Sequence, residues 1–103
     1  MLQQVSSEHF QWLLDQTCPL HLPDGSVLPV QVEAVALHPQ SRLPENSRMP
    51  FSVQLHSLQP TDFIDGLCGL ELPQMGRVED IFVSREPSLG RDPARGYFNI
   101  VFN

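Results

Sequence analysis

The feature that most constrains this chain is an alternation of apolar and polar residues, which recurs in short runs from residue 18 onward. Successive side chains of a strand point to opposite faces of a sheet, so these runs predict strands with one buried face. We expect strands at about 18–22, 26–37, 50–57, 66–72, 77–85 and 96–102. Turn residues separate them at hairpin spacing, which predicts a mainly β fold, a single small antiparallel barrel or sandwich of six strands.

Two connections carry turn chemistry, and the long second strand carries an irregularity. Residues 23–25 combine proline, aspartate and glycine, and residues 73–76 form a similar tight connection. Each predicts a hairpin. In the strand at 26–37, Val32 belongs to one face by alternation, whereas Val35 and Leu37 fall on the other. We therefore expect a β-bulge, or burial on both faces, near Val35.

Residues 6–15 have the spacing of a short helix, which we expect to cover one end of the barrel. Either Ser6 or Ser7 can cap its start, and Phe10 and Leu13 share a face. Trp12 lies about 200° around the helix axis from Phe10, so one flat core face cannot hold both rings. The helix is therefore either embedded on two sides or presents Trp12 to a partner.

Length and composition limit the class of protein. A chain of 103 residues suits one domain, 1–103, and the 41% of hydrophobic residues can supply its core. Ten prolines and six glycines leave no apolar run near the ~20 residues of a membrane span. The start of the chain, 1–4, lacks the features of a secretory signal. We therefore expect a soluble cytoplasmic protein without a membrane partner, although export without a signal would leave the same sequence.

The charge balance argues against a nucleic-acid partner. Twelve acidic residues and six arginines give a net charge of −6, and nucleic-acid affinity comes largely from neutralising phosphates. Four arginines fall in two loops and would form a local basic spot if those loops met: Arg42, Arg48, Arg91 and Arg95. As scattered loop residues they are expected to be solvated surface charge.

The histidines form no recognisable site. The four of them lack the spacing of a helical zinc motif, and no Cys-x-x-Cys accompanies them. His21 and His56 occupy outward positions of their strands, so we expect both to be solvated. No serine lies in a nucleophile elbow, and no glycine-rich turn precedes a helix.

The cysteines and carboxylates also predict structural roles. Cys18 and Cys68 lie in apolar runs without basic neighbours, so we expect buried core thiols rather than nucleophiles. Asp62 and Asp65 can converge in one loop, but two ligands make a poor calcium site. We therefore expect no catalytic residue, no metal and no cofactor.

The features that remain suggest a contact surface. The run 98–103 has no charged side chain and is apolar on both faces. Exposed as a sheet edge it would invite strand addition, so it is paired centrally, covered by the helix or buried in a subunit interface. The residues that we expect to contact a partner are Trp12, Tyr97, Val101, Arg91 and Arg95.

Several stretches carry a resemblance to a known family. They are the strand start Arg48-Met49-Pro50-Phe51-Ser52, the hairpin Leu70-Glu71-Leu72-Pro73-Gln74-Met75-Gly76, the strand Ile81-Phe82-Val83 and the terminal Val101-Phe102-Asn103. Most of the chain resembles an uncharacterised bacterial domain-of-unknown-function family of similar length. The chain departs from the family's pattern near Cys68-Gly69, where relatives carry an aromatic residue, and at Leu72, where they carry a histidine. The resemblance implies a fold but no catalytic residue.

Three classes of function follow, in order of preference. The first is a non-enzymatic protein-interaction module, either part of a larger bacterial assembly or a homo-oligomer. The second is a small-ligand-binding barrel, which would need an interior cavity of several hundred Å³; we expect four phenylalanines to fill that space, Phe51, Phe82, Phe98 and Phe102. The third is an enzyme, which would need at least two of Asp62, Asp65, His38 and His56 in one pocket.

Overall fold

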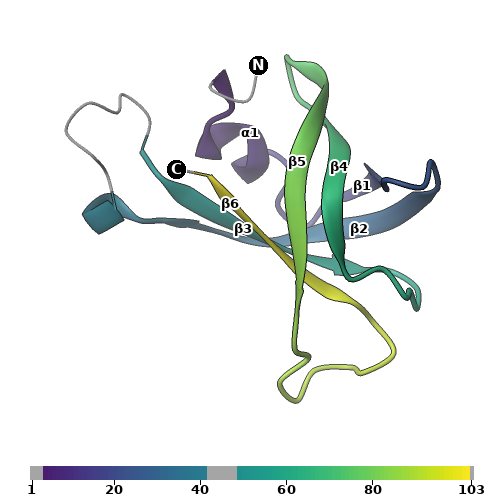
Figure 1. The fold of residues 1–103 in the computed structure, drawn as a ribbon. Helices are drawn as coiled ribbons and strands as arrows, with labels where there is room; N and C mark the ends of the chain where they lie inside the picture. The colour runs from purple at the N-terminus through teal and green to yellow at the C-terminus, as the bar shows by residue number, and fades with distance from the viewer. Residues whose placement is uncertain (1–3, 42–48, 103) are drawn as a thin grey trace.

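The computed structural model describes residues 4–41 and 49–102, which form a closed antiparallel barrel of six strands with one short helix at its N-terminus (Figure 1). The elements are α1 (Ser7–Gln11), β1 (Thr17–His21), β2 (Val27–Leu37), the 3-10 turn η2 (Pro39–Ser41), β3 (Phe51–Ser57), β4 (Asp65–Leu72), β5 (Gly76–Glu86) and β6 (Tyr97–Phe102). The prediction of a mainly β fold is confirmed, and of the two architectures the barrel is the one observed. Within the described ranges, no helix is long and apolar enough to cross a membrane.

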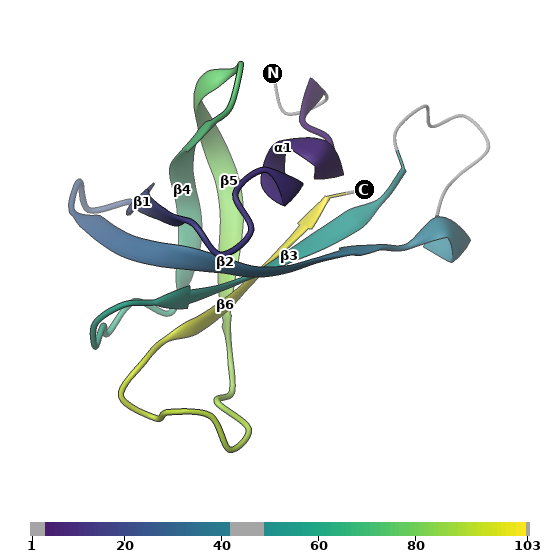
Figure 2. The same cartoon turned by 180° about the vertical axis from the view of Figure 1, so that it is seen from behind.

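The strand order around the barrel is β1-β2-β3-β6-β5-β4, with every neighbouring pair antiparallel. Hairpins account for four of the six pairings, whereas β3 with β6 and β1 with β4 close the barrel. Since β3 and β4 are not neighbours, the chain crosses one end of the barrel between them, at residues 58–64. We call this end the lower mouth; it lies away from α1, as Figures 1 and 2 show.

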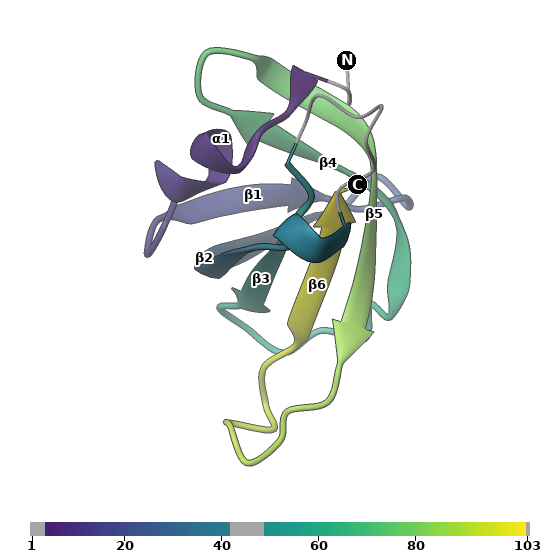
Figure 3. The same cartoon turned by 90° about the vertical axis from the view of Figure 1, so that its left-hand side faces the viewer.

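The opposite end, which we call the upper end, lies beneath α1 (Figure 3). It is closed by aromatic packing. Phe10 of α1 is fully buried, with its ring centroid 6.1 Å from that of Phe51 and 5.6 Å from that of Phe102. The rings of Phe51 and Phe102 stack at 4.7 Å. The helix therefore covers one end of the barrel, as predicted.

The helix is shorter than the predicted range 6–15, because the chain leaves it to pair with β2. Asp15 adopts φ 61° and donates its backbone N–H to the carbonyl oxygen of Val32 at 2.9 Å. Trp12 ends the helix with 52% of its surface exposed. The alternative in which the helix is embedded on two sides is therefore wrong.

The irregularity in β2 is a β-bulge. Val32 pairs with Leu55 and Ala34 pairs with Gln54, so Glu33 is the extra residue. The predicted bulge is confirmed. Beyond it, the residues of β2 that point inward and those that point outward are exchanged relative to simple alternation. Val35 packs against the core, whereas Ala36, which the simple alternation placed with Val32, is exposed.

Two further side chains lie differently from their predicted positions. Phe82 is 55% exposed rather than inward, because its neighbours Ile81 and Val83 take the buried positions of β5. His21 is only partly exposed rather than fully solvated: β1 runs between β2 and β4, and the Nε2 atom of His21 is buried without a hydrogen-bond partner in the described part of the chain.

The final strand is paired on both sides, which is the central position that we considered among three alternatives. β6 pairs with β3 along its whole length and with β5 at Tyr97, Phe98 and Asn99. Phe98 and Ile100 point into the core, whereas Val101 is 60% exposed on the outer face.

Candidate functional site

Polar side chains gather at the lower mouth, around the loop that joins β5 to β6. This loop spans residues 87–96 and projects below the barrel in Figure 1. Its C-terminal end is anchored to β3, because the Gly96 N–H donates to the Ser57 hydroxyl at 2.8 Å and the Ser57 N–H donates to the Gly96 carbonyl. A Cβ atom at Gly96 would lie 2.9 Å from the Phe98 ring. Only glycine therefore fits this anchor without displacing the core.

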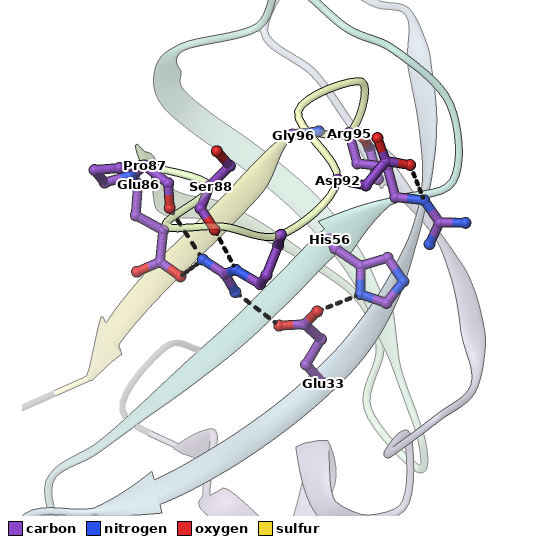
Figure 4. Close-up of polar contacts among 10 residues, drawn as sticks. Glu33, His56, Glu86, Pro87, Ser88, Asp92, Arg95 and Gly96 are labelled. Atoms are coloured by element: carbon purple, nitrogen blue, oxygen red, sulfur yellow. Dashed lines mark hydrogen bonds and ion pairs between the residues drawn. The ribbon is translucent and has the colours of Figure 1, made fainter.

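Arg91 holds the other half of the loop. Figure 4 labels residues that it contacts, Glu33, Glu86, Pro87 and Ser88. Its Nε donates to the Ser88 carbonyl at 2.8 Å, and its Nη2 donates to the Pro87 carbonyl at 3.0 Å. The guanidinium carbon lies 3.9 Å from the centroid of the Tyr97 ring, a cation–π geometry. The arginine therefore fixes the loop conformation and covers Tyr97 at the same time.

Two carboxylates flank this arginine. Glu33 Oε2 is 3.4 Å from Arg91 Nη1, and Glu86 Oε1 is 3.7 Å from Arg91 Nη2. The second oxygen of Glu33 lies 2.7 Å from Nδ1 of His56. Glu33 is the bulged residue of β2, and bulges commonly redirect a side chain. Its carboxylate thus joins the loop to the outer face of β3.

A groove of about 420 Å³ lies beside this network. Its lining residues come from the β3–β4 connection, the end of β5, the loop and the start of β6: Ile64, Arg85, Glu86, Pro87, Ser88, Pro93, Arg95 and Tyr97. Arg85 is held in place, because its Nη1 donates to the carbonyl oxygens of Thr61 and Phe63, both at 2.9 Å.

The tip of the loop carries a strained apolar residue. Leu89 has φ 50° and is followed by Gly90 at φ 86°, and the Arg91 N–H donates to the Ser88 carbonyl at 3.0 Å to close the turn. The side chain of Leu89 is 81% exposed. The left-handed region is unfavourable for leucine by roughly 1–2 kcal/mol. This turn therefore displays an apolar side chain in a conformation that glycine or asparagine would adopt more easily.

A second groove, of about 460 Å³, is acidic. It is lined by Leu22, Pro23, Asp24, Ser26, Thr61, Asp62, Phe63 and Asp65. Asp62 and Asp65 therefore share one groove, as the loop spacing predicted, and Asp24 joins them from the β1–β2 turn. Hydrogen bonds from the hydroxyl and backbone N–H of Ser26 lower the pKa of Asp24 below its ordinary value.

The remaining chemical candidates do not join either groove. His38 Nε2 lies 2.8 Å from the Ser52 hydroxyl, and His56 is engaged with Glu33. Among the described residues, no three or more His, Cys, Asp or Glu side chains are grouped so that they could hold a metal ion. Two of the four residues in the enzyme hypothesis, Asp62 and Asp65, line one groove, so its requirement of two residues in one pocket is met by the carboxylates and by neither histidine.

The cysteines are free and buried, which confirms the prediction of core thiols. Burial raises the pKa of Cys18 and of Cys68 to about 11. The thiolate is the reactive form, so neither residue is an activated nucleophile at neutral pH.

The structure brings together three of the five predicted contact residues, Arg91, Arg95 and Tyr97, at the lower mouth. Tyr97 needs a correction: it is only 5% exposed, because Arg91 lies over its ring. Trp12 is exposed at the other end of the barrel, and Val101 is exposed on the outer face of β6. Of the predicted basic spot, Arg42 and Arg48 lie outside the described residues.

The sequence reasoning missed Glu33, Glu86 and Leu89. The predicted bulge near Val35 was the available signal for Glu33, because a bulged residue commonly leaves the regular alternation of its strand. For Leu89 the signal was the Gly90 that follows it, since glycine marks tight turns.

Comparison with known proteins identifies a family. A family model described as a domain of unknown function, DUF6916, matches residues 5–102. No curated protein and no solved structure matches the chain. The resemblance to a domain-of-unknown-function family is therefore confirmed.

Proposed function

We propose that this chain, which belongs to the DUF6916 family, is a protein-interaction module that contacts its partner through the β5–β6 loop. The observation that carries the proposal is Leu89, which is 81% exposed in a left-handed conformation at the loop tip. An unfavourable backbone conformation persists only where its surroundings enforce it, and such residues cluster at binding and catalytic sites.

The surroundings of Leu89 enforce its position from both sides. Arg91 ties residues 87 and 88 to the loop interior, and Gly96 is bonded to Ser57 at the other end. A loop that is already ordered loses less conformational entropy when it binds. These contacts support a preformed surface with an apolar anchor rather than a loose connection.

The alternative of a ligand inside the barrel has less support. Buried side chains from all six strands form one continuous core cluster, including Leu20, Val30, Leu55, Leu70, Val83 and Phe98. The two grooves described above both lie outside this core.

Paired substitutions at two residues with left-handed backbone conformations test the proposal. Leu89→Asn removes the apolar side chain and accepts the same φ. Gln74→Asn makes a matched change in the β4–β5 turn, where Gln74 has φ 67°. Asparagine tolerates the left-handed region, so we expect both variants to be as stable as the parent chain or more stable by up to about 1 kcal/mol.

Their binding should differ. We expect a photo-crosslinking amino acid at position 89 of the full chain to capture a discrete protein from native lysate, whereas position 74 does not. The affinity of that protein should fall about tenfold in Leu89→Asn and remain unchanged in Gln74→Asn. Failure of position 89 to capture a protein, or equal affinity of both variants, would refute the proposal.

A further inference from the structure

We propose that the 420 Å³ groove at the lower mouth is a carboxylate-binding site in which Arg95 is the main cationic contact. The inference rests on the proposed function for the source of the ligand, an acidic side chain next to an apolar residue in the partner protein. The charge at the groove, its free donors and its apolar walls each support this assignment.

The charge at the groove is opposite to that of the whole chain. The chain has a net charge of −6, yet the groove is lined by two arginines and a single carboxylate. That carboxylate, Glu86, is 3.7 Å from Arg91, which lies outside the lining. The lining itself therefore carries one more cation than anion, with Asp92 beside it paired to Arg95, whereas the chain as a whole is acidic.

The guanidinium of Arg95 has N–H groups that can donate hydrogen bonds to a ligand in the groove. Its Nε forms a long, exposed ion pair with Asp92 Oδ2 at 3.8 Å, beyond hydrogen-bond distance, and the other Asp92 oxygen accepts from the Ala94 N–H at 3.0 Å. A ligand carboxylate would therefore compete with Asp92 for Arg95. No side-chain hydrogen bond of Arg95 is found within residues 4–41 and 49–102, and 42% of its side chain is exposed. A guanidinium with free N–H groups is suited to bidentate recognition of a carboxylate.

The rest of the groove supplies a fixed wall and an apolar surface. Arg85 is oriented by its two bonds to backbone carbonyls, and Tyr97 is held beneath Arg91. Ile64 is 60% exposed at the edge of the groove, and Pro93 lines it as well. A carboxylate on Arg95 would thus leave an adjacent apolar side chain in contact with Ile64.

A carboxylate fits this site better than a phosphate group or a nucleic acid. Phosphate sites commonly combine several cations or backbone N–H groups. Here Glu86 adds a negative charge to the lining, and the chain as a whole would repel a polyanion.

The test uses the full chain, labelled with nitrogen-15, and two short peptides. The probe is acetyl-Leu-Glu-amide, and its uncharged match is acetyl-Leu-Gln-amide. We expect saturable chemical-shift changes in residues 85–97 with the first peptide and about tenfold weaker binding or none with the second. Phosphate and a single-stranded oligonucleotide are titrated in parallel.

Two arginine variants locate the contact. Arg95→Gln should weaken binding of the glutamate peptide about tenfold. Arg77→Gln should leave it unchanged, because Arg77 is a half-exposed arginine in an ion pair with Glu79 on β5, outside the groove. Equal binding by Arg95→Gln and the parent chain, equal binding of both peptides, or binding of phosphate or the oligonucleotide alone would overturn the inference.

The outcome is separable from that of the proposed function. Capture of a protein by position 89, without binding of the glutamate peptide, would overturn the carboxylate site alone. Binding of the peptide through Arg95, without a captured protein, would leave a carboxylate site whose ligand is a free small molecule; free phenylpropionate, titrated in the same way, should then reproduce the shifts.

Discussion

The two ends of the barrel are closed by different chemistry. At the upper end, Phe10 packs onto Phe51 and Phe102 with no exposed surface of its own. At the lower mouth, Arg85 and Arg91 bind backbone carbonyls and carboxylates at a partly exposed surface. Buried apolar contacts cannot be exchanged without exposing the core, whereas exposed polar contacts can be exchanged for those of a partner. The difference supports the proposal that the binding surface lies at the lower mouth.

The largest effect is expected from a substitution at the upper end. Phe10→Ala should lower the free energy of unfolding by about 3–4 kcal/mol, because it leaves a cavity above Phe51 and Phe102. Urea denaturation measures this loss. The control is Trp12→Ala at the end of the same helix, where the side chain is 52% exposed and the loss should be smaller, about 1 kcal/mol. Similar losses in both variants would contradict an upper end closed by Phe10.

A smaller effect is expected when the lower mouth loses its fixed arginine. Arg85→Met removes the bonds to the carbonyls of Thr61 and Phe63 but keeps an apolar side chain over Phe98. We expect the free energy of unfolding to fall by about 2 kcal/mol, since one hydrogen bond to a charged group contributes about 1.5–3 kcal/mol and here both bonds share a single donor nitrogen at a partly exposed site. Arg77→Met, at an exposed ion pair, should lose less than about 0.5 kcal/mol. Equal losses would show that Arg85 does not close the mouth.

The smallest effect is expected at the bulge. Glu33→Gln weakens the contacts with His56 and Arg91, and we expect about 1 kcal/mol of lost stability. The distinctive readout is amide hydrogen exchange, which should accelerate in residues 87–96 and stay unchanged in α1. Glu71→Gln, on the exposed face of β4, provides the control. Uniform acceleration over the whole barrel would mean that Glu33 supports the fold rather than the loop.

Local patterns predicted much of the fold. The alternation of apolar residues indicated six strands, and residues 23–25 indicated the first hairpin, because both signals depend on neighbours along the chain. Val32 and Val35 are both apolar but fall on opposite faces of a regular strand, and this mismatch predicted the bulge. The apolar setting of Cys18 and Cys68 predicted buried thiols.

The candidate site was harder to predict because its contacts join distant parts of the chain. Glu33 and His56 are 23 residues apart, and Glu33 and Arg91 are 58 apart. Tyr97 could be proposed as a contact residue, but its burial depends on where Arg91 lies. Trp12 remained ambiguous because its exposure depends on which elements pack around α1, and a local pattern does not encode that packing.

By itself, the sequence determined that short two-faced strands share one apolar interior, since strand periodicity and turn chemistry are properties of neighbouring residues. Only the tertiary structure decided that β3 pairs with β6 and β1 with β4, and that Arg85, Arg91 and Arg95 meet at one mouth. The physical reason is that barrel closure and long-range polar contacts depend on the register between strands far apart in the chain, which alternation within a single strand does not encode.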